Sequence, residues 1–198
     1  MDKMAELNGL IVNQFVEMAE VFTGFEARNR YSVKNTDGEE IYLAEEYQSN
    51  TLLRIYLRNF RPFEMAIRSD VSTIVFTISR PFRFYFHEIS INDRDGKVIG
   101  QVKKEFALLE RIYTIYDARG RQIFELHGPV FRPWTFFIKW RGNEIGKITK
   151  KWSGVAKEAF TVADNFGVLF PKNLPVEHKA LLLGAVFLID FVHFENRK

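Results

Sequence analysis

The sequence predicts a mainly β protein in which an antiparallel sheet closes, or curls strongly, around a helix near the C-terminus. Three observations predict this fold class. Residues 180–189 are all apolar, so a helix there has apolar side chains on every side. Four turns marked by glycine join segments of alternating pattern. No linker or low-complexity block divides the 198 residues, which indicates a single domain over residues 1–198.

The strands are expected where β-branched and aromatic residues gather between turn signals, and these rules predict about a dozen short strands. Residues 10–22 fit either a first strand with a short connector or a helix, because short apolar runs are ambiguous by period. We favour the strand. Further strand-like runs cover residues 52–57, 62–67 and 73–78.

Hairpin turns are predicted at four dipeptides that end in glycine, because glycine adopts the positive φ that tight hairpins require. They are Asp37-Gly38, Asp95-Gly96, Arg119-Gly120 and Arg141-Gly142. Their spacing favours a meander over βαβ crossovers. A further tripeptide, His127-Gly128-Pro129, also resembles a turn.

The final element is predicted as a helix over about residues 176–194. A membrane-spanning helix needs about 20 predominantly apolar residues. This run instead meets Asp190 after ten apolar residues. A long sheet removes its edges by closing, and a closed barrel of many strands has room for a helix. We therefore expect the helix to be buried along the barrel axis.

Composition narrows the function classes. Lysine and arginine exceed aspartate and glutamate by 28 to 25, and the pI is about 9.0, which is compatible with anionic partners. The absence of cysteine excludes a disulfide framework and a thiol nucleophile. No secretion signal precedes residue 10, so we expect a cytoplasmic protein. The histidines are scattered and no catalytic motif occurs, so we do not expect an enzyme.

Several motifs then point to a known family. They are Gly24-Phe-Glu-Ala-Arg-Asn-Arg-Tyr31, Arg80-Pro-Phe-Arg83, His127-Gly-Pro129, the stretch from Ile145 to Pro171, and Lys179-Ala-Leu-Leu-Leu-Gly-Ala-Val-Phe-Leu-Ile-Asp-Phe191. In these motifs and their order, from about Leu10 to Glu195, the chain resembles the phospholipid scramblase family, as a cysteine-free, bacterial-type member. The resemblance implies the tubby-like architecture, a closed antiparallel barrel of twelve strands around a buried C-terminal helix.

Two departures from the family pattern bear on function. Val162, Asn173 and Pro175 stand where the family's proposed calcium segment has acidic residues, which leaves Asp164 and Asn165 as its remnant. Calcium takes about six to eight oxygen ligands, so we expect no calcium, no other metal and no cofactor. The aromatic segment 83–87 replaces a cysteine cluster that can be palmitoylated in vertebrate members, so that membrane anchor is absent.

Five residues are predicted to bind a lipid headgroup: Arg141, Lys147, Lys150, Lys151 and Trp152. Their cations suit phosphate, and Trp152, with Trp140, suits a membrane interface. Alternation places Lys147 with Thr149 on one face and Ile148 with Lys150 on the other, so a solvated hairpin surface is the alternative. Asp190 and His193 lie on one side of the helix, either as a buried acid or proton relay or, as we favour, as a polar stripe paired with backbone groups or arginines.

The predicted function is membrane-peripheral binding of anionic phospholipids, on the inner face of the membrane, with a role in transbilayer phospholipid movement. Carrying headgroups across about 30 Å of hydrocarbon needs a polar route, which makes lipid binding the firmer prediction. Two alternatives stay open. One is a structural or interaction domain with a protein or nucleic-acid partner and no lipid transport. The other is an enzyme whose site is not visible in the sequence.

Overall fold

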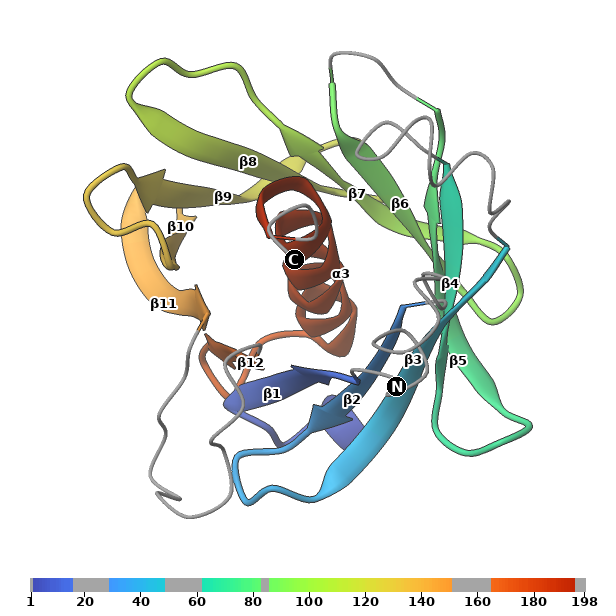
Figure 1. The fold of residues 1–198 in the computed structure, drawn as a ribbon. Coiled ribbons are helices and arrows are strands. Elements are labelled where there is room, and N and C mark those ends of the chain that lie inside the picture. Colours follow the sequence, from blue (N-terminus) through green and yellow to red (C-terminus); the bar gives the residue numbers. More distant parts are fainter. Residues whose placement is uncertain (1, 16–28, 49–61, 83–85, 151–164, 195–198) are drawn as a thin grey trace, which may run out of the picture.

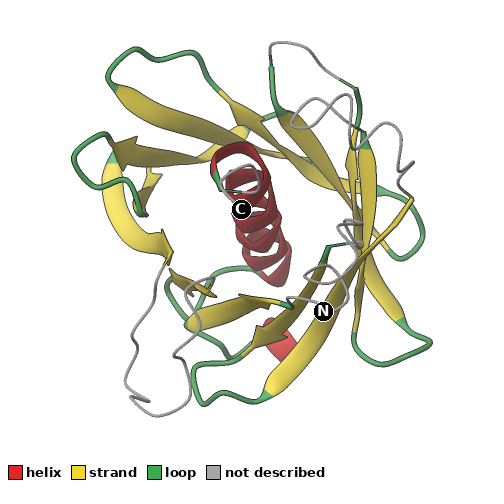
Figure 2. Ribbon diagram, viewed as in Figure 1, coloured by secondary structure: helices red, strands yellow, loops and turns green. Residues whose placement is uncertain are grey.

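The computed structural model describes residues 2–15, 29–48, 62–82, 86–150 and 165–194. A short 3-10 helix, η1 (Asp2–Met4), precedes the sheet. The described chain then forms twelve strands and one α-helix, as predicted (Figure 2). The strands are β1 (Gly9–Gln14), β2 (Arg30–Lys34), β3 (Glu40–Gln48), β4 (Phe63–Arg68), β5 (Ile74–Arg80), β6 (Glu88–Asp93), β7 (Val98–Lys104), β8 (Glu110–Asp117), β9 (Gln122–Pro129), β10 (Thr135–Trp140), β11 (Asn143–Lys150) and β12 (Asn165–Leu169).

The sheet is a closed meander. Each strand from β2 to β12 pairs with its neighbours in sequence, and β1 pairs with both β2 and β12, so the barrel is complete (Figure 1). The closing register places Gly9 opposite Leu169 and Asn13 opposite Asn165. All pairs are antiparallel, which confirms the predicted closed antiparallel barrel.

The four predicted hairpin turns are present. Gly38, Gly96, Gly120 and Gly142 all have positive φ, as a tight turn between antiparallel strands requires. The first strand is also as favoured, since residues 9–14 form β1, whereas residues 16–22 lie outside the described chain. The run 52–57 lies outside it as well.

The expectation of a turn at residues 127–129 is wrong, because these residues end strand β9. Pro129 is the last residue of the strand, a position that tolerates a missing N–H donor. Glycine is needed at position 128 for close packing and not for a turn. A Cβ there would lie only 2.6 Å from Cε1 of Phe136.

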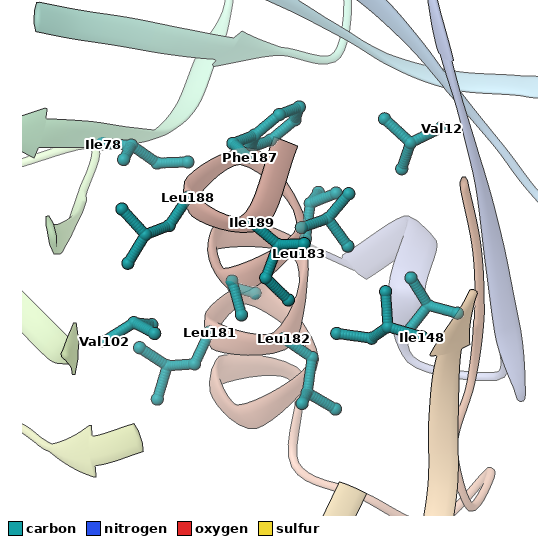
Figure 3. Close-up of a cluster of buried hydrophobic side chains, with 14 of the residues drawn as sticks. Val12, Ile78, Val102, Ile148, Leu181, Leu182, Leu183, Phe187, Leu188 and Ile189 are labelled. Atoms are coloured by element: carbon teal, nitrogen blue, oxygen red, sulfur yellow. The ribbon is translucent and has the colours of Figure 1, made fainter. Parts of the chain in front are cut away.

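The α-helix, α3 (Val176–His193), runs through the barrel and confirms the predicted buried C-terminal helix (Figure 1). Every residue from position 179 to 191 is buried. Figure 3 shows how its side chains meet those of the strands on several sides; the labelled helix residues are Leu181, Leu182, Leu183, Phe187, Leu188 and Ile189, and the labelled strand residues are Val12, Ile78, Val102 and Ile148. The sheet therefore supplies the apolar environment that this helix needs.

Glycine allows the helix to approach the sheet closely. A Cβ at Gly100 of β7 would lie 2.9 Å from the Leu181 side chain and 2.2 Å from the Tyr116 carbonyl oxygen. A Cβ at Gly184 of α3 would lie 2.9 Å from Cγ1 of Ile91 on β6. Both positions lack the space for a larger residue.

The two ends of the barrel differ in their connections. One end, which we call the tight-turn end, carries the turns at residues 35–39, 69–73, 94–97, 118–121 and 141–142. The opposite end, the long-loop end, carries the connections 81–87, 105–109 and 130–134. Helix α3 begins at the tight-turn end, because β12 finishes there, and it ends at the long-loop end.

Candidate functional site

Of the five residues that were predicted to bind a headgroup, the structure describes Arg141, Lys147 and Lys150, and these three do not lie together. Arg141 is exposed in the β10–β11 turn at the tight-turn end, with a positive φ of 49°, and its guanidinium lies 5.2 Å from the Trp140 ring centroid. Lys147 is partly exposed on β11. Lys151 and Trp152 lie outside the described residues.

Lys150 points into the barrel. Its Nζ donates to Oδ1 of Asp190 at 3.2 Å, and it also lies 4.3 Å from the ring centroid of Phe194 and 5.0 Å from that of Phe166. The residue is 6% exposed. Lys150 therefore belongs to the interior and is not placed to meet a ligand on the outer surface.

Backbone groups or arginines were the expected partners of the polar stripe near the end of α3, and the structure shows side chains from three strands there. Asp190 accepts a hydrogen bond of 2.9 Å from the Tyr31 hydroxyl in addition to the Lys150 contact. The Tyr113 hydroxyl lies 2.8 Å from Nε2 of His193. Burial raises the pKa of Tyr113, so its hydroxyl stays protonated.

The remnant of the calcium segment falls at the start of β12. Asn165 is buried, with 3% of its surface exposed, and it is opposite Asn13 in the sheet. Asp164 lies outside the described residues. Within the described residues, no group of three or more potential metal-ligating side chains was found.

A cleft of about 480 Å³ lies at the tight-turn end, between the start of β9 and the end of β10. Its lining includes the cations Arg121, Lys139 and Arg141 together with Glu125. Arg121 is engaged by Asp117, with 2.7 Å between Nη2 and Oδ2. The charge that this cleft offers an anion is therefore partly neutralised within the chain.

Exposed apolar side chains are concentrated at the long-loop end. The described residues include twelve large hydrophobic side chains that are exposed. Three of them lie at or near the tight-turn end: Val71, Val98 and Trp140. The other nine lie in or beside the connections of the long-loop end: Phe15, Tyr47, Phe82, Phe86, Phe106, Leu108, Leu109, Val130 and Phe131.

The tight-turn end is polar by contrast. Its turns are held by side-chain oxygens that accept backbone N–H donors. Asp93 accepts from the N–H of Asp95 and Lys97, and Asp117 accepts from the N–H of Arg119 and Arg121. Asn35 and Asp70 act in the same way in their own turns. Among the described residues, exposed apolar side chains therefore mark the long-loop end and polar turns mark the opposite end.

Hydrogen bonds from the side chain of Arg111 hold the apolar loop at residues 130–134. The Arg111 guanidinium donates to the carbonyl oxygens of Gly128, Pro129, Arg132 and Pro133 at 2.6 to 3.3 Å. It also stacks on Phe136, with 4.4 Å between Cζ and the ring centroid. The exposed tip residue, Phe131, is thus presented by a loop with defined backbone contacts.

No helix among the described residues has the length and apolar character needed to cross a bilayer.

The chain matches the profile of the scramblase family over residues 1–196. It is 35% identical to mouse phospholipid scramblase 1, over 99% of this chain and 64% of that protein. Bovine phospholipid scramblase 2 is 34% identical over 98% of this chain and 71% of its own length, and human phospholipid scramblase family member 5 is 32% identical over 99% and 77%. The chain thus spans less than two thirds of the mouse protein. No solved structure matches it.

Proposed function

Because this chain belongs to the scramblase family, we propose that it binds anionic phospholipids as a membrane-peripheral protein. The observation that carries the proposal is the similarity, over nearly the whole chain, to proteins named phospholipid scramblases. The net charge of +3 favours anionic lipids over neutral ones. The cytoplasmic leaflet, which carries those lipids, is the proposed location.

The geometry supports contact through the outside of the barrel. The apolar residues of α3 are enclosed by the strands, so the helix is not available as an anchor in this fold. Lipid contact is then left to the exterior of the barrel. Binding of this kind combines buried apolar area with attraction between basic residues and anionic headgroups, and it weakens as salt rises.

Co-sedimentation with liposomes tests the proposal. The full chain is mixed with vesicles of phosphatidylcholine alone, or of equal parts phosphatidylcholine and phosphatidylserine, with and without calcium. We expect binding to the mixed vesicles at low ionic strength, weaker binding to the neutral ones and no requirement for calcium. Absence of binding to the mixed vesicles at low salt would overturn the proposal.

Transbilayer movement of phospholipid is the further activity that we propose. A headgroup must cross about 30 Å of hydrocarbon, which calls for a polar path or a local disturbance of the bilayer. The test is a vesicle assay in which a membrane-impermeant reductant bleaches fluorescent lipid in the outer leaflet. Bleaching beyond the outer-leaflet fraction is the expected result, and protein-free vesicles are the control. Bleaching that stops at that fraction would restrict the function to binding.

A further inference from the structure

We infer that the long-loop end of the barrel is the face that enters the membrane, with the apolar tips of residues 105–109 and 130–134 inserted into an anionic bilayer. The inference rests on the proposed phospholipid binding and names the surface responsible for it. It places the polar tight-turn end, with Arg141, away from the bilayer.

The exposure of the tips is the first step. Phe131 is 97% exposed, Leu108 is 85% exposed and Phe106 is 83% exposed. Single exposed apolar residues are common, but large ones that gather on one face mark an interaction surface. Transfer of these side chains out of water lowers the free energy, and the acyl region of a bilayer accepts them without specific partners.

The second step is that the tips lie on neighbouring strands. Glu110 at the start of β8 is opposite Pro129 at the end of β9, so the two loops emerge side by side. The backbone N–H of Lys104, at the end of β7, donates to the carbonyl oxygen of His87, which directly follows Phe86. Phe86 therefore lies beside the 105–109 loop, and the three described apolar segments are on adjacent connections.

The third step concerns charge. Lys104, Arg111 and Arg132 flank the two loops. Of the two acidic residues there, Glu110 is engaged by His127 at 2.9 Å and Glu105 is partly exposed. Basic residues beside apolar tips suit the boundary between anionic headgroups and acyl chains. The tight-turn end also carries cations, among them Arg121, Lys139 and Arg141, so charge alone does not distinguish the two ends. Apolar exposure selects the long-loop end, and the basic residues beside its tips suit anionic headgroups.

The fourth step separates a bilayer from a protein partner. The apolar residues are the tips of separate loops rather than the walls of a groove, and each tip can enter a fluid surface independently. Arg111 fixes the 130–134 loop through its four carbonyl contacts, so little ordering entropy is lost on insertion. Both features favour lipid as the occupant.

The absence of cysteine allows a direct test. Single cysteines are introduced by Leu108→Cys and Phe131→Cys at the long-loop end, and by Val71→Cys and Asn143→Cys at the tight-turn end. Each is labelled with a fluorophore whose emission shifts to the blue in apolar surroundings. With mixed phosphatidylcholine and phosphatidylserine vesicles we expect a blue shift at positions 108 and 131 and none at 71 and 143.

Matched substitutions give the second measurement. The pair Leu108→Ser and Phe131→Ser is expected to weaken vesicle binding about tenfold or more, because two large apolar side chains no longer enter the lipid. The control pair, Val71→Ser and Val98→Ser, removes two exposed apolar side chains at the other end and should change affinity by less than about twofold. Thermal unfolding of both pairs checks that the fold is kept.

The outcomes are distinguishable. If the unsubstituted chain does not bind vesicles, the proposed function falls and the inference falls with it. If the chain binds but the blue shift appears only at position 143, the inference is wrong and phospholipid binding stands. A third outcome concerns the chain in the absence of lipid. If the unsubstituted chain is then a multimer and the Leu108→Ser and Phe131→Ser variant is a monomer, a second copy of the chain covers this face and the inference is wrong.

Discussion

Lys150 and Asp190 form an ion pair inside the barrel, with 3.2 Å between Nζ and Oδ1 and with 5% and 3% of their side chains exposed. The pair joins β11 to α3 near the long-loop end. Tyr31 on β2 donates to the second carboxylate oxygen, so three elements meet at one buried charge. Such a pair is costly to break, because one charge then remains in the interior without its partner.

The substitution Lys150→Met should therefore lower the free energy of unfolding by about 3–5 kcal/mol. Urea unfolding measures the change. Lys147→Met, three residues away on the same strand and partly exposed, is the control and should change stability by about 0.5 kcal/mol or less. A combined Lys150→Met and Asp190→Leu variant should recover much of the loss. Equal effects of the two single lysine substitutions would contradict the importance of the pair.

The fold could be predicted because its signals are local. Glycine supplies the positive φ at four of the five tight turns, and the apolar run 180–189 forms a helix that has apolar side chains on every side. Closure then follows from the need to remove edges. The prediction of a turn at residues 127–129 was wrong because Gly128 makes room for the ring of Phe136, which belongs to the next strand, β10.

The candidate site could be predicted only in part. Alternation had already placed Lys150 on the same face as Ile148, and Ile148 is fully buried. The sequence did not show which face of β11 points into the barrel. That face is fixed by closure of the sheet and by the contact of Lys150 with Asp190, which lies forty residues further along the chain. The exposed tips were not predicted, because no local signal distinguishes Phe106, Leu108 and Phe131 from core residues. The topology places them in connections.

His87 should make stability depend on pH. Arg80 donates from Nη2 to Nδ1 of His87, which requires a neutral ring. Burial, with the nearby charges of Arg80 and Lys104, lowers the pKa of His87 from 6.5 to about 4. The unfolded chain therefore binds more protons between these values. We expect the free energy of unfolding to fall by about 1–2 kcal/mol as pH drops through this window, since the ring is only half-buried.

The variant His87→Gln isolates this contribution, because other groups also titrate over the same range. Urea unfolding from pH 7 to pH 4 should show a shallower decline in stability for the variant than for the parent. Parallel pH profiles would show that His87 does not account for the dependence.

Lys179 should hold the start of the chain against α3. The residue is fully buried, and its Nζ donates to the carbonyl oxygens of Met4, Ala5, Leu7 and Lys172 at 2.7 to 3.0 Å. Lys179→Met should cost about 2–4 kcal/mol, because these carbonyls lose a charged donor. Unfolding in urea measures the cost. Lys172→Met, an exposed lysine paired with Glu6, is the control and should be nearly neutral.

Arg111 should affect membrane binding by positioning the loop that carries Phe131. Arg111→Lys keeps the charge but cannot reach four carbonyls with a planar fork. If the tip is inserted as inferred, the variant should bind anionic vesicles about three- to tenfold more weakly. The fluorophore at position 131 should also shift less. Arg119→Lys, in an exposed turn at the opposite end, is the matched control. If Arg111→Lys binds vesicles as tightly as the parent, the prediction that Arg111 affects membrane binding through this loop is wrong.

Ala185→Arg tests whether α3 is an interior element or an anchor. Ala185 is fully buried within the barrel, so a guanidinium there has no partner and no space. Burying an unpaired charge should prevent soluble folding. Glu177→Arg, on the exposed first turn of the same helix, should remain soluble with a loss of about 1 kcal/mol or less from the helix dipole. Soluble yield and circular dichroism measure both variants. A folded Ala185→Arg protein that had merely lost vesicle binding would mean that α3 leaves the barrel to reach lipid.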